Sequence, residues 1–498
     1  MSTHHISRPA RGLAALCATA FLVLASSAAA NVPLNRVSSD PFTNTTSQHA
    51  TEVEPDTFSH GSTVVSVFQV GRFFNGGGTD IGFATSTNGG VSYATSGFLP
   101  GLTATSGLGD STGAPFERVS DASVAFDAKH GVWLASSIPI TSSLVVPTVF
   151  TNRSTDGGQT WQIPTTIPPP AAKNVNLDKN WIACDNTPAS PHFGNCYTEF
   201  DNPGQLDLEY MSTSTDGGLT WSQPVSPQGN PHGLGGQPVV QPDGTVIVPF
   251  ETITGKEAAF KSTDGGASWS HAVTIASIAF QTVGGGLRTS PLPSAEIDGA
   301  GNVYVAWEDC RFRAKCSSND IVFSSSSNGT SWSAVNRVPI DSVTSGADHF
   351  IPGLAVDKAT SGSGAHLGLT YYYYPDATCT GGCRLDTGFI SSPDGGKHWG
   401  APTQLSGPTS LSDIANTSQG PMVGDYISTS FNASGRATAL IAVGAPHTGT
   451  TFDEAMFAPA SPLRVATASG ATRAANSSGV QSTGGTGQGE LLRSIRRG

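Results

Sequence analysis

The sequence has little charge and few sulfur-containing residues. Only 12% of its 498 residues are charged, about half of the usual quarter. The formal net charge is −12, which argues against nucleic acid or anionic lipid as a partner. The chain has 4 Met and 7 Cys but 59 Gly, and Ser and Thr are abundant. This composition is typical of an extracellular protein of many short strands and turns.

Several catalytic signatures are missing as well. The sequence contains no G-x-S-x-G elbow, no H-E-x-x-H, no P-loop and no calcium-loop consensus. These absences argue against serine hydrolase, zincin and nucleotide chemistry. We predict neither a cofactor nor a metal.

Long apolar runs are confined to the first 30 residues. Arg8 and Arg11 precede the run LAALCATAFLVLA, and SSAAA follows it. This is the pattern of a signal peptide, so we predict cleavage near Ala30 and export to the extracellular space or the periplasm. No other stretch is long and apolar enough to suggest a membrane span.

The six cysteines that follow the leader fall into close pairs. Neither their spacing nor the lack of histidine partners fits a zinc site, and in an exported chain such pairs indicate local disulfides. The expected disulfides are Cys184–Cys196, Cys310–Cys316 and Cys379–Cys383.

The most informative feature present is a repeated eight-residue phrase. STDGGQTW begins at Ser154, STDGGLTW at Ser214 and STDGGASW at Ser262. Weaker copies are STNGGVSY from Ser86 and SPDGGKHW from Ser392. The sequence is therefore that of a repeat protein.

A sixth copy, SSSNGTSW from Ser325, puts Ser327 where the aspartate is expected. Aspartate followed by two glycines suits a hairpin tip, because the carboxylate accepts backbone N–H bonds while glycine takes positive φ at little cost. The terminal aromatic is expected to wedge between neighbouring repeats. We therefore predict a structural role for the aspartates of the phrase, Asp156, Asp216, Asp264 and Asp394.

The phrase resembles the Asp-box, or BNR repeat, of the sialidase superfamily of β-propellers, where it joins the third and fourth strands of a blade. The resemblance covers nearly the whole chain after the leader. It implies an all-β fold, a propeller of four-stranded antiparallel blades. Strand pairs between the boxes, such as QPVVQPDGTVIVPFE from Gln237, fit the first two strands of a blade.

Laying this template along the chain from Glu52 predicts seven blades, although the box spacing also allows six. The strand that begins at Asn31 is expected to complete the last blade and close the ring. A closed ring has no free sheet edge, and we expect a monomer. The predicted domains are a signal peptide at 1–30, the propeller at 31–464 and a tail at 465–498, whose small polar residues predict disorder.

The resemblance also implies an activity, that of an exo-acting glycoside hydrolase for sialic acid or another acidic sugar. Sialidases hold the substrate carboxylate with three arginines, protonate the leaving group with an aspartate, and attack with a tyrosine primed by a glutamate. Candidates come from the strand ends that face the central funnel, on the face away from the boxes. They are Arg72, Arg288 and Arg311 for the carboxylate, Tyr426 or Tyr374 as nucleophile, Glu308 or Glu54 as its base, and Asp121 or Asp425 as the acid, with His349 and Tyr374 as further substrate contacts and Asp178 and Lys179 as other strand starts.

One departure from the family keeps two alternatives open. The region that matches the Arg-Ile-Pro motif of sialidases reads TEVEPDTFSHG, with Glu54 and Pro55 and no arginine. The first alternative is a non-catalytic propeller that binds a glycan or a protein. The second is a polysaccharide lyase with His349 or Tyr426 as its base.

Overall fold

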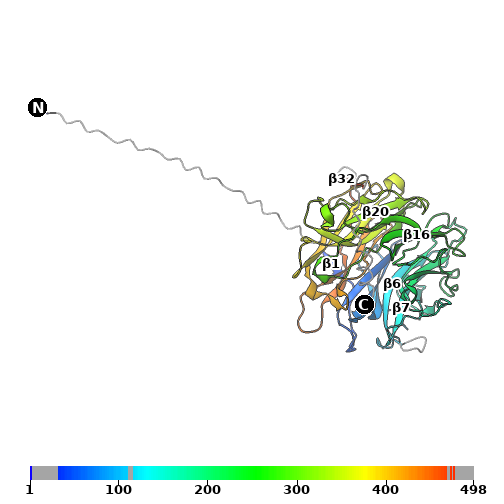
Figure 1. The fold of residues 1–498 in the computed structure, drawn as a ribbon. Helices are drawn as coiled ribbons and strands as arrows, with labels where there is room; N and C mark the ends of the chain where they lie inside the picture. The colour runs from blue at the N-terminus through cyan, green and yellow to red at the C-terminus, as the bar shows by residue number, and fades with distance from the viewer. Residues whose placement is uncertain (3–31, 110–115, 468–471, 474, 477–498) are drawn as a thin grey trace. The chain divides into compact units, whose positions relative to one another are not determined.

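The computed structural model describes residues 1–2, 32–109, 116–467, 472–473 and 475–476. The chain divides into two compact units, Met1–Ala30 and Asn31–Gly498. The predicted signal peptide lies outside the described residues except for its first two. Within its described residues the second unit contains antiparallel strands (Figure 1) and five short 3₁₀ turns, Pro203–Gln205, Gly284–Gly286, Ala314–Cys316, Gly362–Gly364 and Leu411–Asp413.

The first two repeats form one sheet. A single residue pair, Gly78 with Val119, joins their four-stranded halves. The first half comprises β2 (Glu52–His60), β3 (Thr63–Arg72), β4 (Gly78–Ser86) and β5 (Thr95–Phe98), and the second comprises β6 (Phe116–Asp127), β7 (Val132–Thr141), β8 (Phe150–Ser154) and β9 (Thr165–Thr166).

The next two repeats form separate sheets. One contains β10 (Asp178–Cys184), β11 (Cys196–Asn202) and β12 (Leu208–Ser214), and an isolated bridge between Met211 and Val225 stands where a fourth strand would be. The other contains β13 (Gly233–Leu234), β14 (Val239–Val240), β15 (Val246–Thr252), β16 (Lys256–Ser262) and β17 (Val273–Ser277).

The last three sheets follow the same antiparallel order. They are β18 (Ser294–Ile297), β19 (Val303–Asp309), β20 (Asp320–Ser326) and β21 (Asn336–Arg337); β22 (Asp348–Val356), β23 (Leu367–Tyr374), β24 (Arg384–Ser392) and β26 (Thr403–Ser410); and β29 (Ser428–Phe431), β30 (Ala437–Gly444), β31 (Glu454–Pro459) and β1 (Leu34–Arg36). Two small strand pairs are also present: β25 (His398–Trp399) pairs with β32 (Thr472–Arg473) from the end of the chain, and β27 (Ala415–Thr417) forms a hairpin with β28 (Gly420–Met422).

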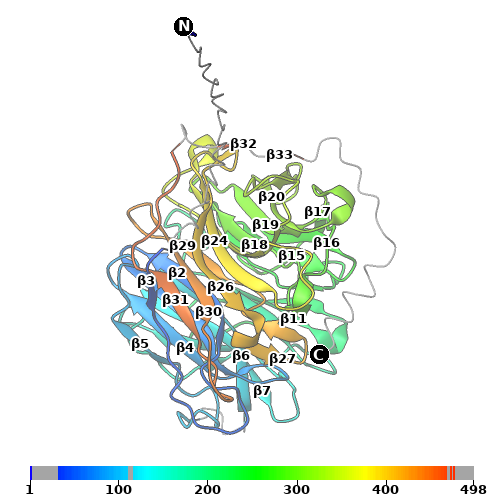
Figure 2. The same ribbon diagram turned by 90° about the vertical axis from the view of Figure 1, so that its left-hand side faces the viewer.

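Segments from both ends of this unit lie side by side. β1 pairs with β31, and Leu34 lies opposite Pro459. Figure 2 shows β30 and β31 in orange beside β2 and β3 in blue, and β2 contacts both β30 and β31. In the predicted tail, the backbone of β32 pairs with β25, and that of β33 (Ala475–Asn476) pairs with β21. The rest of the tail from residue 477 lies outside the described residues.

One strand of each repeat, here called its inner strand, contacts the inner strand of the next repeat in chain order. Contacts run from β2 to β6, β10, β14, β18, β22 and β29, and β29 contacts β2 again. Side chains bridge these strands: Asp56 Oδ2 accepts the Val124 N–H at 2.8 Å, and Ser294 Oγ accepts the Leu354 N–H at 2.9 Å. These bonds satisfy backbone donors of inner strands that have no further ladder partner.

The repeated phrase forms a turn between the third and fourth strands, here called the box turn. In the turn that begins at Ser154, Asp156 Oδ1 accepts the Thr160 N–H at 2.9 Å, and the Ser154 hydroxyl accepts the Gly158 N–H at 2.9 Å. Hydrogen bonding by Thr160 lowers the pKa of Asp156 to about 2. The Thr160 hydroxyl donates to the other oxygen of Asp156, as the Thr220 and Ser268 hydroxyls do to Asp216 and Asp264. In the turn at Asp394 the His398 imidazole takes the place of this hydroxyl.

These turns pack on the neighbouring repeat. Trp161 lies 5.9 Å from Phe83, and Trp399 lies 5.9 Å from Phe323, measured between ring centroids. The second glycine of a turn fits closely as well: a Cβ on Gly158, whose φ is +77°, would lie 2.5 Å from the Val65 side chain. The predicted wedge between neighbouring repeats is therefore present in the structure.

The sixth copy is aligned differently from the sequence prediction. Asn328, not Ser327, takes the place of the aspartate: its Oδ1 accepts the N–H groups of Thr330 and Ser331, both at 2.9 Å. Ser326 accepts the Gly329 N–H at 2.9 Å. This turn closes with one residue fewer, because a single glycine follows the asparagine.

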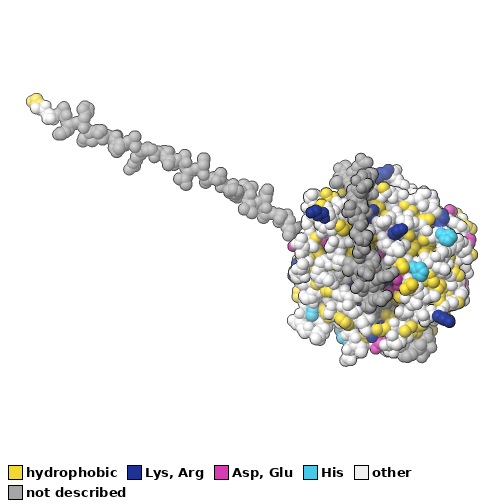
Figure 3. Space-filling model, in the orientation of Figure 1, with side chains coloured by type: hydrophobic (Ala, Val, Ile, Leu, Met, Phe, Trp, Pro, Cys, Tyr) yellow, Lys and Arg dark blue, Asp and Glu magenta, His cyan; other side chains and the backbone are white. Residues whose placement is uncertain are grey.

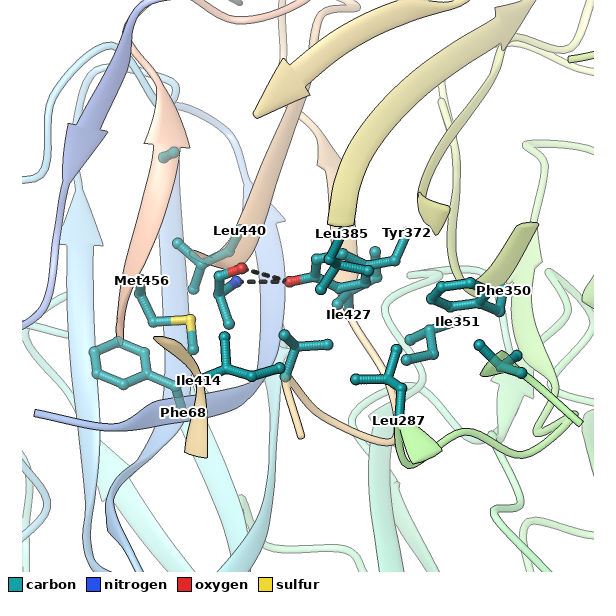
Figure 4. Close-up of a cluster of buried hydrophobic side chains, with 14 of the residues drawn as sticks. Phe68, Leu287, Phe350, Ile351, Tyr372, Leu385, Ile414, Ile427, Leu440 and Met456 are labelled. Carbon is teal, nitrogen blue, oxygen red and sulfur yellow. Dashed lines mark hydrogen bonds between the residues drawn. The ribbon is translucent and has the colours of Figure 1, made fainter. Parts of the chain in front are cut away.

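A large hydrophobic cluster packs beneath the segments that contain Leu287 and Ile414. Figure 4 shows Leu287 and Ile414, which directly precedes β27, packed with Phe350 and Leu440. The Tyr372 hydroxyl donates to the Ala442 carbonyl at 2.8 Å and accepts the Ala442 N–H at 2.9 Å.

All three expected disulfides are present, Cys184–Cys196, Cys310–Cys316 and Cys379–Cys383. Charged side chains are sparse and scattered on the face shown in Figure 3. Within the described part of the chain, no helix has the length and apolar character needed to cross a membrane.

Candidate functional site

Four of the inner strands carry the same irregularity near their starts. A bulge interrupts the register of β2, β6, β10 and β22. At each bulge one non-glycine residue takes a left-handed conformation: φ is 55° at Glu54, 50° at Asp121, 52° at Lys179 and 48° at Ile351. Such backbone costs free energy and redirects a side chain, and it is concentrated at functional sites.

Three of these four residues belong to a group of ionisable side chains that we call the charged centre. Its members are Glu54, Arg72, Asp121, Asp178, Lys179, Arg288 and Asp425. All are buried or nearly so, and the side chains of Arg288 and Asp425 are only 16% and 7% exposed.

Asp425 is the hub of the charged centre. The Arg288 guanidinium grips its carboxylate with two bonds, Nε to Oδ1 at 2.7 Å and Nη2 to Oδ2 at 2.5 Å. The Lys179 ammonium donates to the same Oδ2. Burial would raise the pKa of Asp425, but Arg288 and Lys179 outweigh it and hold the pKa far below its usual range.

A chain of hydrogen bonds extends from Asp425 to Arg72. Glu54 Oε1 accepts the Asp425 N–H at 3.1 Å, and Glu54 Oε2 accepts from the Gln69 amide. Arg72 Nη1 in turn donates to Gln69 Oε1 at 2.6 Å. Burial, followed by the nearby Asp425 and Asp121 charges, raises the pKa of Glu54 to about 7.

Two aspartates complete the charged centre around the backbone of Lys179. Its N–H donates to Asp121 Oδ2 and to Asp178 Oδ1, both at 3.0 Å, and its ammonium lies 3.9 Å from Asp121. Burial and then the Asp121 charge raise the pKa of Asp178 to about 7. For Asp121, burial is outweighed by Lys179 and the Ser120 hydroxyl, which lower the pKa.

Tyr426 lies beside the charged centre with its hydroxyl already bonded. That hydroxyl donates to the Ala122 carbonyl at 3.2 Å, and the ring packs edge-on against Trp181 at 5.1 Å. Burial, followed by the charges of Glu54 and Asp121, raises the pKa of Tyr426 well above its ordinary value. The phenol is therefore held in its protonated form.

Two segments contact the charged centre, residues 284–288, which contain Arg288, and residues 415–423, whose Val423 carbonyl accepts the Glu54 N–H at 3.2 Å. They are joined by a bond from the Arg288 N–H to the Pro421 carbonyl at 2.9 Å. The Cys379–Cys383 loop supports the first segment, since a Cβ on Gly284 would lie 2.4 Å from the Cys379 carbonyl oxygen. Beside Lys179, Asp425 and Tyr426 there is a cavity of only about 20 Å³, room for about one water molecule.

The structure thus gathers Arg72, Arg288, Asp121, Asp425 and Tyr426, but it separates other predicted residues from them. Arg311 is bound to Asp309, with Nε–Oδ1 at 2.8 Å and Nη2–Oδ2 at 2.6 Å. Glu308 accepts the Ile351 N–H at 2.9 Å. Tyr374 packs on Phe350 at 5.1 Å.

His349 belongs to another buried charge network. Its ring nitrogens lie 4.0 Å from Asp320 and 3.7 Å from Asp341. These three groups are close enough to hold a metal ion, but Arg313 and Arg337 both bind the two carboxylates. Two guanidiniums already neutralise the aspartates, so the network is suited to stability and not to a cation. Burial lowers the pKa of His349 to about 4.

The chain was also compared with known proteins. No family model matches it, and no curated protein matches it significantly. Among solved structures it resembles a Hadza microbial sialidase, with 16% identity, a TM-score of 0.42, and coverage of 87% of this chain and 68% of the other. It also resembles the NanB sialidase of Streptococcus pneumoniae (13% identity, TM-score 0.42, coverage 85% and 70%) and a Dyadobacter fermentans protein of unknown function (15%, 0.45, 72% and 99%). These similarities assign no role to any residue of the charged centre.

The sequence names Lys179 as the start of a strand but does not mark it as a residue of the site.

Buried acids near the start of the third strand in six repeats were also not predicted from the sequence. Five of these acids precede a phenylalanine by three residues, a recurring D/E-x-x-F pattern that the sequence itself displays. The six acids are Asp80, Glu209, Glu257, Asp320, Asp386 and Glu454.

Three of these acids directly face another acid across the sheet, and in one of the three pairs, Asp309 with Asp320, arginines bind both carboxylates. In the other two pairs, Asp201 lies opposite Glu209, and Glu251 opposite Glu257. Burial raises the pKa of Glu209 to about 7 and that of Glu257 well above its ordinary value. Facing carboxylates repel when both are ionised, so these pairs favour a protonated member.

Proposed function

We propose that the second unit is a seven-bladed propeller closed by its N-terminal strand. The closed series of contacts from β2 through β29 back to β2 supports seven repeats around one axis. The pairing of β1 with β31 supports closure of the last repeat by the N-terminal strand. The three disulfides support export, because such bonds persist in oxidising compartments. A ring without free edges fits a monomer.

We further propose that the protein is an exported glycan-binding propeller and not a sialidase-like hydrolase. The observation that carries this proposal is the occupation of the charged centre by Asp425. Arg288 and Lys179 offer the cationic groups that would hold a substrate carboxylate, but Arg288 already binds both oxygens of Asp425 and Lys179 binds its Oδ2. An acidic sugar would have to displace a buried, multiply bonded carboxylate.

The state of Tyr426 supports the same conclusion. A tyrosine nucleophile needs a base that takes its proton, but its hydroxyl donates to a backbone carbonyl, and its pKa is well above the ordinary value. The oxygens of Glu54 are taken by Gln69 and by the Asp425 N–H. No primed nucleophile results from this arrangement.

A sialidase-like hydrolase is the second candidate, favoured by one observation. Arg72, Arg288, Asp121 and Tyr426, four residues of the types that such a reaction uses, converge on the axis, and Asp121 has strained backbone. In that case the segments 284–288 and 415–423 would have to open. The lyase alternative has less support, because His349 lies in the separate arginine–aspartate network.

The test is to measure binding and product formation on one glycan panel. The purified protein is titrated calorimetrically with neutral and sialylated oligosaccharides, and each mixture is assayed for released sugar and for ultraviolet absorbance. We expect binding of some glycans with every ligand recovered unchanged. Released sialic acid would support the hydrolase, absorbance of an unsaturated uronate would support the lyase, and no binding at all would refute the glycan-binding proposal.

A further inference from the structure

A cavity of about 440 Å³ opens on the axis at the end that carries the box turns. All seven inner strands contribute to its wall. The rim is formed by turns that follow these strands, with Gly61, Pro242, Ala359 and Ala433 among its residues. We call this cavity the axial channel.

A surface groove of about 520 Å³ continues from the axial channel. The two share Gly61, Asn432 and Ala433, and the groove extends along the box turn at Asn88 and Gly89. A ligand could therefore place one end in the axial channel while the next units lie in the groove. This geometry fits an elongated ligand better than a single small molecule.

The lining of the axial channel combines aromatic faces with hydroxyl groups. Phe58, Trp181 and Phe431 line it and are only partly buried. Thr57 Oγ1 lies 2.8 Å from Ser428 Oγ and 2.7 Å from Ser430 Oγ, which makes a hydroxyl cluster on the wall. Aromatic faces that stack on apolar ring faces, together with a few placed polar groups, are what a pyranose ring requires.

The charge of the lining excludes one class of glycan. Four acids, Asp56, Glu296, Asp298 and Asp357, line the axial channel. Lys358 lies 3.9 Å from Glu296 but is itself 53% exposed at the rim. A carboxylated sugar in the axial channel would face these acids. Lys358 at the rim and Arg436 in the groove are cations of the described lining, and neither is buried.

The axial channel is distinct from the charged centre. Trp181 and Gln237 line both the axial channel and the small cavity beside Lys179 and Asp425, so they form the partition between the two. Gln237 is fixed there because its Oε1 accepts the Ala295 N–H at 2.8 Å. The axial channel therefore has room for a ligand, whereas the charged centre is buried beside a cavity of only about 20 Å³.

From these observations we propose that the axial channel and its groove bind the end of an oligosaccharide that carries no negative charge. The inference rests on the proposed glycan-binding function and names its site and ligand class. A peptide is the less favoured occupant, because the partly buried aromatic side chains and the hydroxyl cluster match sugar rings.

The experiment is a calorimetric titration of the full chain with neutral cello-, manno- and chito-oligosaccharides, with sialyllactose and oligogalacturonate as acidic ligands. Phe431→Ala and Trp181→Phe remove stacking area from the axial channel, and we expect each to weaken binding of a neutral ligand roughly three- to tenfold. Phe74→Ala is the matched control: Phe74 is 53% exposed and is not among the axial channel residues, so its affinity should equal that of the wild type. Circular dichroism confirms that each variant is folded.

The outcomes separate this inference from the proposed function. If neutral ligands bind the wild type, and Phe431→Ala and Trp181→Phe alone weaken that binding, the inference is supported. Equal binding by wild type and both variants places the glycan elsewhere and overturns the inference alone. Acidic ligands that bind as tightly as neutral ones, or a peptide that displaces the neutral ligand, overturn the ligand class. A wild-type protein that binds no glycan overturns both proposals.

Discussion

Replacing Asp425 with asparagine should strongly destabilise the fold. The substitution keeps the shape of the side chain but removes the charge that pairs with Arg288 at 2.7 and 2.5 Å and with the Lys179 ammonium. It leaves two buried cations, only 16% and 8% exposed, without their carboxylate. Breaking a buried pair in this way costs about 3 to 5 kcal/mol, and we expect the free energy of unfolding to fall by that amount.

The measurement is urea unfolding followed by tryptophan fluorescence, with the midpoint and the slope fitted separately. Asp453→Asn is the control, because Asp453 pairs with Arg36 at 2.7 Å on the surface, where the side chains are 46% and 41% exposed. Exposed pairs contribute less than about 1 kcal/mol. If the two variants lose similar stability, the charged centre is not the paired, buried network described above.

Three further predictions concern pH, a glycine and the disulfides. Glu54 and Asp178 have folded-state pKa values of about 7, above their unfolded values, so the stability that they contribute is fully present below about pH 4 and is lost as pH rises through 7. Asp425 behaves oppositely, because its pKa is lowered in the folded state, and its contribution to stability is lost in acid. Thermal scans should therefore show the highest stability near pH 4 to 5 and lower stability at pH 8. A maximum at pH 8 would contradict this prediction. Gly158→Ala should lower the melting temperature, because the φ of Gly158 is +77° and the Val65 side chain would lie 2.5 Å from the new Cβ. Gly364→Ala is the control and should leave the melting temperature unchanged, because nothing lies within 4 Å of its Cβ position. Equal effects of the two substitutions would refute the close packing of the box turn. Reduction of the three disulfides should cost about 2 to 5 kcal/mol in unfolding experiments with and without reductant, and unchanged stability would show that they contribute little.

The local elements of this fold follow closely from the sequence. The box phrases specify their turns because each contains its own hydrogen-bond acceptor and its own glycines, so Asp156 and Gly158 could be placed without knowledge of the rest. The disulfides were predictable for the same reason, since short separations leave few alternatives. Ser327 was misplaced because the copy at Ser325 has lost one glycine, which shifts the acceptor to Asn328.

The charged centre was only partly predictable. Strand starts pointed to Arg288, Asp121 and Asp425, which the structure does bring together, but not to their pairing with one another. Which cation meets which carboxylate depends on bulges such as the one at Lys179 and on the segments 284–288 and 415–423, and neither has a local signature. Glu308 and Arg311 lie at similar strand ends, yet they bond to Ile351 and Asp309.

We propose that Asp425 occupies Arg288 and Lys179, the cations that would otherwise be free to hold a substrate carboxylate. The most direct test is to incubate the purified protein with a fluorogenic sialoside and with sialyllactose over a range of pH, and to measure released sialic acid. We predict no release above that of a buffer control. Release that disappears in Arg288→Ala and in Tyr426→Phe would contradict the claim and establish the hydrolase instead.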